Sequence, residues 1–318
     1  MNSFSGSKRA YSLMLQAVSH ITSRDRNILR MIRKCRVLTT DQVSDLFFSN
    51  VNTAQHRLTI LYELQLLQRF RILTDRYDNT RYHYVLDQLG AMFVGAEDDD
   101  KKDPDKMRWN TGVALALGRS QRLAHIVGTN GFFVALTHTA RRNKNCRLAQ
   151  WWPEWKCAAE WGEVVRPDGY GVWVEDRVRL PFLLEYDRGT ETLERLGEKL
   201  KGYDILARAA GYQTVVLFSF PSPQRESHAR YLLAHGSVPV ATCSRSSGGS
   251  PAGAIWRLVG DVGGARLRLI DLAFRTARLP AAGGGGDSAT HEKALSNAWY
   301  RFVEVPSTDQ TAQTGGQL

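Results

Sequence analysis

The sequence contains few cysteines, and none of them lies in a metal-binding pattern. Cys35, Cys146, Cys157 and Cys243 are scattered, with no CxxC pair and no histidine at zinc-finger spacing. This excludes a zinc finger and predicts reduced, buried thiols. The chain also lacks an apolar segment long enough to span a membrane, and the residues after Met1 lack the charged and apolar regions of a signal peptide. We therefore expect a cytoplasmic protein without a membrane partner.

Acidic residues are the minority charge. The 318 residues include 42 Lys and Arg against 32 Asp and Glu, which gives a formal net charge of +10. A basic chain favours an anionic partner, and nucleic acid is the first candidate. The alternative is that the charge only keeps the protein soluble. The length allows two domains, each with its own core.

The N-terminal region predicts three helices followed by a β-hairpin. Hydrophobic spacing predicts the first helix at residues 24–36, after a cap at Ser23, and a short second helix that opens with Thr39-Thr40-Asp41-Gln42. The third helix runs from a cap at Asn52 or Thr53 to about residue 67. The two strands of the hairpin are expected at 69–73 and 81–86, around the turn Asp78-Asn79. This order is typical of a winged helix-turn-helix, which we assign to residues 21–95 after a flexible leader at 1–20.

In a winged helix the second helix of the turn motif enters the major groove of DNA. The face that it would present carries side chains able to contact bases or phosphates, namely Thr53, Gln55, His56, Arg57 and Thr59. Arg76 and Arg81 on the hairpin would contact the DNA backbone. These residues predict binding to double-stranded DNA. The same fold also serves protein contacts and dimerisation, so a homodimer stays open.

Beyond an acidic linker at residues 96–108, the pattern predicts a second domain at 109–275 and a flexible tail at 276–318. The expected elements are a long helix at 110–142, strands at 156–161, 168–174, 180–186 and 213–220, a helix at 192–210, and short elements at 226–233, 238–243 and 255–259. The order is one helix, three strands, one helix and one strand.

Two carboxylates fall at corresponding places in this pattern. Asp168 begins one predicted strand and Glu185 ends the next, so an antiparallel hairpin would bring them side by side. Two facing carboxylates repel unless a positive charge lies between them, and a divalent metal is a common choice. The hairpin therefore predicts a metal site. The alternative is a strand end whose charges pair with Arg166 and Lys199 for structural reasons.

The order of elements, with Pro167-Asp168 on one strand and Glu185 on the next, resembles the PD-(D/E)XK nuclease superfamily. The fuller strings Arg-Pro-Asp-Gly-Tyr-Gly from 166, Phe-Leu-Leu-Glu-Tyr-Asp-Arg-Gly-Thr-Glu from 182 and Lys-Leu-Lys-Gly-Tyr from 199 are similar to the replication-relaxation family of plasmid and conjugative-element proteins. The resemblance implies an α+β chain in which a winged helix-turn-helix precedes a PD-(D/E)XK restriction-endonuclease-like α/β domain.

By this resemblance, Asp168 and Glu185 are the metal-binding acids, with Mg²⁺ or Mn²⁺ as cofactor. The superfamily has a lysine two residues after the glutamate, where this chain has Asp187. Asp187 could then ligate a metal or act as a base, and Lys199 on the following helix is the first choice for the missing cation, before Lys201. Possible supporting residues are Glu160, Arg188, His125 and Tyr203.

The resemblance implies a metal-dependent DNA endonuclease or nickase in plasmid replication or mobilisation. Its partners would be plasmid DNA and replication or conjugative-transfer proteins. The alternative is a catalytically inactive DNA-binding regulator of replication or transcription.

Two features before the acidic hairpin each allow two interpretations. Trp151, Trp152 and Trp155 could stack on bases or pack the sheet, and the basic residues 141–147 could contact phosphates or only solvent.

Overall fold

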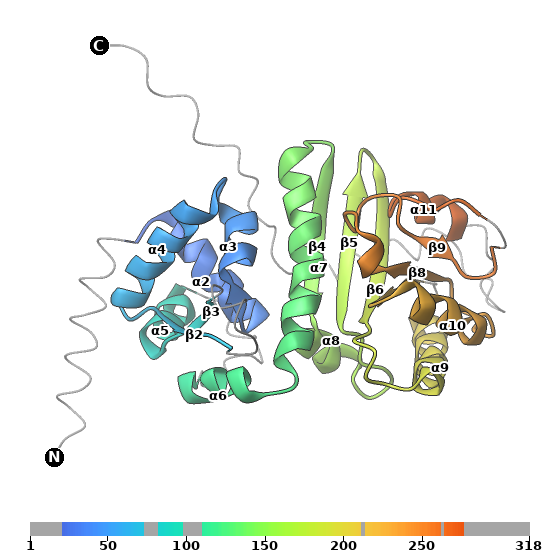
Figure 1. The fold of residues 1–318 in the computed structure, drawn as a ribbon, viewed down its shortest axis with the longest axis horizontal. Helices are drawn as coiled ribbons and strands as arrows, with labels where there is room; N and C mark the ends of the chain where they lie inside the picture. Colours follow the sequence, from blue (N-terminus) through green and yellow to red (C-terminus); the bar gives the residue numbers. More distant parts are fainter. Residues whose placement is uncertain (1–20, 73–81, 98–109, 211–213, 262–263, 277–318) are drawn as a thin grey trace, which may run out of the picture. The chain divides into compact units, whose positions relative to one another are not determined.

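The computed structural model describes residues 21–72, 82–97, 110–210, 214–261 and 264–276. It shows a mixed α+β chain (Figure 1) that divides into two compact units, residues 1–138 and 139–318. Among the described helices, none combines the length and apolar character needed to cross a membrane. All four cysteines are buried free thiols, as expected from their spacing.

The first unit is mostly helical and contains a small antiparallel sheet. Its elements are α2 (Ser23–Cys35), β1 (Leu38–Thr39), α3 (Thr40–Phe47), α4 (Val51–Glu63), β2 (Leu67–Phe70), β3 (His83–Leu86), α5 (Gln88–Glu97), α6 (Thr111–Ala116), the 3-10 turn η1 (Leu117–Arg119) and the start of α7 (Leu123–Arg142). The strand order is β1-β3-β2, so β3 is central. Ile28, Leu29, Leu58 and Tyr84 are fully or almost fully buried in this unit.

The helix starts differ slightly from those expected from sequence. Thr22, and not Ser23, caps α2, and its hydroxyl and backbone form a capping box with Asp25. Asn50, and not Asn52 or Thr53, caps α4, because its side-chain oxygen accepts from both of those backbone amides. The capping signature that opens at Thr39 is confirmed, since Thr39 and Gln42 form a reciprocal box at the start of α3.

The expected single helix at 110–142 is instead divided into α6, η1 and α7. The first part of α7 belongs to the first unit. The side-chain amide of Asn130 donates to the carbonyls of Cys35 at 3.1 Å and Val37 at 3.0 Å, and the Gln42 amide donates to the carbonyl of Val127 at 2.8 Å. The units consequently divide after His138 and not in the expected linker. The leader, most of the linker and the tail lie outside the described residues.

The second unit contains a six-stranded sheet. Its elements after α7 are β4 (Cys146–Pro153), α8 (Glu154–Trp161), β5 (Gly169–Glu175), β6 (Val178–Tyr186), α9 (Leu193–Ala210), β7 (Val215–Phe220), α10 (Pro223–Leu233), β8 (Val240–Ser244), the 3-10 turn η2 (Arg245–Ser247), β9 (Arg257–Leu258) and α11 (Asp271–Thr276). The strand order is β4-β5-β6-β7-β8-β9. The pairs β4-β5, β5-β6 and β8-β9 are antiparallel, whereas β6-β7 and β7-β8 are parallel.

The prediction of a strand at 156–161 is wrong, because these residues belong to helix α8. The first strand is β4, which already includes Trp151 and Trp152. Trp152 packs in the core, with its ring centroid 5.5 Å from that of Trp161 on α8 and 5.2 Å from that of Tyr170 on β5. Pro153 ends the strand and precedes the helix. The buried pair Trp151 and Trp152 therefore packs the sheet and does not present a base-stacking surface.

One face of the sheet is covered by α8, α9 and α10, whose buried side chains form a single cluster with those of the strands. It includes Cys157, Leu196, Leu200, Tyr203, Ala229, Leu233, Val172, Leu183 and Phe218.

On the hairpin β5–β6, Phe182 lies against the backbone of Gly171, its directly paired residue. A Cβ at Gly171 would lie 2.3 Å from the Phe182 ring, so this close approach requires glycine.

Candidate functional site

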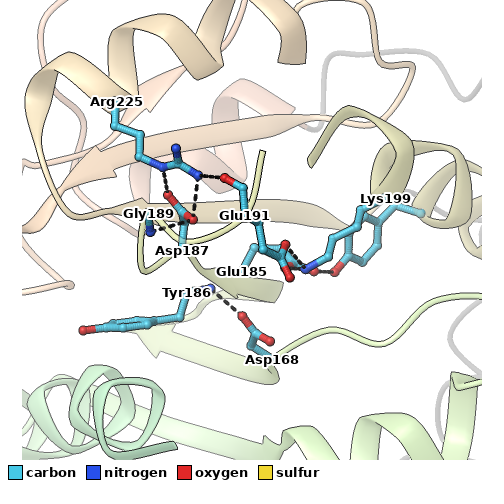
Figure 2. A network of polar contacts seen from close by, with 9 residues as sticks. Asp168, Glu185, Tyr186, Asp187, Gly189, Glu191, Lys199 and Arg225 are labelled. Atoms are coloured by element: carbon cyan, nitrogen blue, oxygen red, sulfur yellow. Dashed lines mark hydrogen bonds and ion pairs between the residues drawn. The ribbon is translucent and has the colours of Figure 1, made fainter. Parts of the chain in front are cut away.

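The hairpin β5–β6 brings Asp168 and Glu185 together. Gly169 pairs with Leu184, so each acid is adjacent to this pair on its own strand. The backbone amide of Asp168 donates to the Leu184 carbonyl at 3.0 Å, and the Asp168 carboxylate accepts from the Tyr186 amide at 2.7 Å (Figure 2). Asp168 is 8% exposed and Glu185 only 2%. Both acids therefore lie in a shielded site where their charges interact strongly.

Helix α9 supplies two partners to Glu185. Lys199 Nζ lies 2.7 Å from Glu185 Oε2 (Figure 2). The Tyr203 hydroxyl donates a short hydrogen bond to Glu185 Oε1. Lys199 and Tyr203 are four residues apart, so one face of the helix presents both groups to the same carboxylate. The Lys199 side chain is 32% exposed, and this side of the cluster is accessible to solvent. The structure thus joins Glu185, Lys199 and Tyr203, all of which the sequence analysis proposed for the site.

The environment shifts the protonation of this cluster. Burial, followed by the nearby charge of Asp168, raises the pKa of Glu185 to about 7, although Lys199 and Tyr203 oppose the shift. Burial alone would lower the pKa of Lys199, but the charges of Glu185 and Asp168 outweigh burial and raise it. Burial and Glu185 raise the pKa of Tyr203 well above its usual value. Lys199 is therefore a permanent cation, whereas Glu185 can change its protonation near neutral pH.

Asp187 is engaged elsewhere. Its carboxylate forms two hydrogen bonds with the Arg225 guanidinium, one of them from Nη2 at 3.1 Å, and also accepts from the Gly189 amide at 3.0 Å (Figure 2). The Asp187 side chain is 2% exposed. The expectation that Asp187 is a metal ligand or base finds no support in this geometry, because its oxygens hold a guanidinium and a backbone amide.

The donor set decides which metal site these residues fit. Within the described residues, no group of three or more His, Cys, Asp or Glu side chains is placed to hold a metal ion. Asp168 and Glu185 offer two carboxylates, and Mg²⁺ in particular is often held by one or two carboxylates completed by water and phosphate. The residues therefore fit a site with these two acids as its protein ligands, and do not fit one that includes Asp187.

The other expected supporting residues are Glu160, Arg188 and His125. Glu160 is exposed on α8 and not at the end of a strand, and Arg188 is exposed just beyond β6. His125 lies on the part of α7 that belongs to the first unit. Arg225 was missed from sequence. It bonds to an acid 38 residues earlier, and no local spacing signals that contact.

In the first unit, the residues expected to contact DNA differ in their exposure. Thr53, Gln55 and His56 are exposed on α4, while Thr59 is half-buried and donates to the Gln55 carbonyl at 3.0 Å. Arg76 and Arg81 lie outside the described residues. The side chains of α4 that remain available to a partner are thus mainly neutral, with Arg57 as the one expected cation on this face.

Arg57 has a structural partner. Its Nε lies 2.8 Å from Asp25 Oδ1, and Nη2 lies 2.5 Å from Oδ2, so the guanidinium forks onto an acid of α2 that is fully buried. Burial alone would raise the pKa of Asp25, but hydrogen bonds from Arg57 and Thr22 reverse this and lower it. Contact between Arg57 and DNA stays a prediction, but the main contact of this side chain is internal.

The comparison with protein families identifies the family to which this chain belongs. A family model described as replication-relaxation matches residues 29–217. The chain belongs to the replication-relaxation family. The matched segment includes both acids of the hairpin and their partners Lys199 and Tyr203, but it ends before Arg225. The family's description points to a role in plasmid replication or relaxation. Neither the curated proteins nor the solved structures include a match to the chain.

Proposed function

We propose that this protein binds double-stranded plasmid DNA through its first unit and cleaves a phosphodiester bond in its second, with Mg²⁺ or Mn²⁺ as cofactor. The observation that carries this proposal is the contact between Lys199 and Glu185 beside Asp168. Two acids and one lysine at the end of a β-hairpin are the groups that a PD-(D/E)XK centre requires. Here Lys199 of α9 would be that lysine, because Asp187, just beyond β6, occupies the usual place of the lysine in the sequence.

The order of elements in the first unit supports a winged helix. Three helices, of which α3 and α4 are joined by a short connection, precede the strands β2 and β3, and the sheet order is β1-β3-β2. In this fold α4 is the helix that enters the major groove. Its exposed Gln55 can bond bidentately to adenine, and Thr53 and His56 lie on the same accessible stretch. The basic charge of the chain supports binding to the phosphate backbone.

In the second unit each residue has a distinct part in the chemistry. A bound divalent metal would polarise the phosphate and lower the pKa of the attacking water. Asp168 and Glu185 would hold it, and Tyr203 keeps the Glu185 carboxylate in place through its hydrogen bond. Lys199 places a positive charge at the accessible side of the cluster, where it can offset the charge that develops on the phosphate during cleavage.

A plasmid cleavage assay tests this function. Supercoiled plasmid is incubated with the full chain and Mg²⁺ or Mn²⁺, in parallel with the Glu185→Gln variant and with Lys201→Gln as a matched control. Lys201 is exposed on the same helix as Lys199, so its loss changes the charge without touching the cluster. Relaxed or linear plasmid that requires metal and Glu185, but not Lys201, supports the proposal. Intact plasmid under every condition overturns it.

One observation favours a second function, a DNA-binding regulator that leaves DNA uncut. Both oxygens of Glu185 already have partners in the protein, and Asp187 is held by Arg225. Such a protein would bind DNA equally well with Mg²⁺ or with a chelator, and Glu185→Gln would not change its affinity. Fluorescence anisotropy with a labelled duplex distinguishes the two, because a metal site at the scissile phosphate makes binding depend on metal and on Glu185.

The same assay tests the contact face of α4. We expect binding to weaken steeply as salt rises, since contacts to phosphates release bound cations. Gln55→Ala should weaken binding by about 1–3 kcal/mol, but only for duplexes that carry the preferred base. Gln224→Ala, an exposed glutamine in the other unit, is the matched control. If the affinity for DNA changes neither with salt nor on the Gln55→Ala substitution, the first unit would instead have a role in protein contacts.

A further inference from the structure

Asp187 and Arg225 form a clamp whose position in the chain gives it a role beyond their own ion pair. Arg225 Nη2 donates to Asp187 Oδ1 at 3.1 Å and also to the Glu191 carbonyl at 2.5 Å. It therefore ties both ends of the connection between β6 and α9. Within this connection, Gly189 adopts a positive φ of 81° and its amide donates to Asp187. The connection is thus held at Asp187, Gly189 and Glu191 at once (Figure 2).

This connection leads directly to Lys199. Glu191 is held by its carbonyl to Arg225, and its carboxylate lies 3.7 Å from Lys199 Nζ. Lys199 in turn lies 2.7 Å from Glu185. The contacts therefore run from Arg225 through Glu191 to Lys199 and Glu185. A flexible lysine side chain loses considerable rotamer freedom when it is held at one carboxylate, so fixed surroundings are required to keep it there.

We propose that Asp187 and Arg225 are positioning residues, which fix the start of α9 so that Lys199 takes the place of the lysine absent from β6. This inference rests on the proposed function, and it gives the acid at 187 a part in the site without contact to metal or DNA. Arginine suits the task, because its planar fork bonds to a carboxylate and a carbonyl at the same time, whereas lysine presents a single charged centre.

Lysine labelling of the full chain tests the position of Lys199 without relying on cleavage. Limited reductive methylation followed by mass spectrometry reports how readily each amine reacts, and an ammonium held at a carboxylate reacts slowly. We expect Lys199 to be methylated severalfold faster in Arg225→Gln than in the native chain, because the side chain is then no longer held at Glu185. The rate of the exposed Lys201 on the same helix should stay constant. Arg208→Gln, which removes a guanidinium paired with Asp204 on the surface of α9, is the control and should leave Lys199 protected.

A second variant controls for the possibility that Arg225→Gln disturbs the fold. Arg225→Gln leaves the Asp187 carboxylate buried without its cation, whereas the double variant Asp187→Asn/Arg225→Gln removes both charges together. Faster methylation of Lys199 in the double variant, with native circular dichroism, supports the inference. Unchanged protection of Lys199 in a folded double variant overturns it.

Cleavage kinetics separate this inference from the proposed function. If the native chain cuts plasmid, we expect the double variant to lower kcat with little change in KM, because DNA binding does not depend on the clamp; a change in KM alone would contradict the positioning role. If the native chain cuts nothing in any metal, the proposed function fails, and the methylation result alone decides whether the clamp holds Lys199.

Discussion

Lys199 Nζ lies 2.7 Å from Glu185 Oε2, so a lysine from helix α9 reaches a carboxylate near the end of strand β6. Asp187, just beyond this strand, lies where the PD-(D/E)XK superfamily, which the sequence resembles, has lysine. In the nuclease site that we propose, the positive charge would thus come from a different element. This relationship makes Lys199, and not a strand residue, the side chain on which cleavage should depend most.

Loss of the Lys199 charge should therefore slow cleavage strongly. We expect Lys199→Met to reduce kcat by about 10²–10³-fold, the range found when one group that stabilises transition-state charge is removed. Lys199→Arg should restore part of the rate because it keeps the charge. The measurement is single-turnover relaxation of supercoiled plasmid in Mg²⁺. Equal rates for Lys199→Met and the exposed control Lys201→Met would show that Lys199 has no such part.

The raised pKa of Glu185 makes stability depend on pH in a defined direction. Its value moves from 4.5 to about 7 on folding, so between these limits the folded state holds a proton that the unfolded state has released. The contribution of protonated Glu185 is complete below pH 4.5 and is lost as pH rises towards 7. Urea unfolding should show native stability falling across this window relative to Glu185→Gln. Parallel curves for the two proteins would contradict the shift.

The ion pair between Arg57 and Asp25 should stabilise the first unit. Arg57→Met would leave Asp25 buried without its cation, and we expect a loss of about 3–5 kcal/mol in the free energy of unfolding, as for other broken buried pairs. Gln55→Ala, two residues earlier on the exposed face, should change stability by less than about 0.5 kcal/mol. Thermal and urea unfolding give both values. A similar small effect at the two positions would contradict a structural role for Arg57.

Asn130 should anchor α7 to the first unit. Its side-chain amide serves the carbonyls of Cys35 and Val37 and is itself buried. Asn130→Leu would leave two buried carbonyls without a donor, at a cost of about 1–3 kcal/mol for each that stays unpaired. We expect faster amide hydrogen exchange in the part of α7 that belongs to the first unit, from Leu123 to His138. The exposed Asn143 at the other end of this helix offers the control Asn143→Leu, for which exchange should stay native.

The sequence predicted the hairpin and its acids because both signals are local. Asp168 and Glu185 sit at the ends of β-prone runs, and the side chains of Lys199 and Tyr203 follow from helical spacing on α9. The partners of Asp187 and Arg57 could not be predicted in the same way. Each of these pairs joins elements more than 30 residues apart, and only the tertiary fold brings them together.

The failure at residues 156–161 has a different cause. Cys157 and Trp161, with two alanines between them, fit both a buried strand and a helix that packs on a sheet. Pro153 was the available signal, because proline commonly ends a strand and opens a helix, and it places the boundary where the structure has it. Likewise, most of α7 belongs to the first unit, where Asn130 bonds to Cys35 and Val37, and no sequence spacing reveals these partners.

The clamp at Asp187 also limits how this chain could evolve. A single replacement of Asp187 by lysine, which would recover the ordinary superfamily pattern, would set a second cation against the Arg225 guanidinium in a shielded position. That substitution would be disfavoured until residue 225 had changed first. Relatives that carry lysine at this position should therefore lack the arginine, so the two positions would vary together across the family.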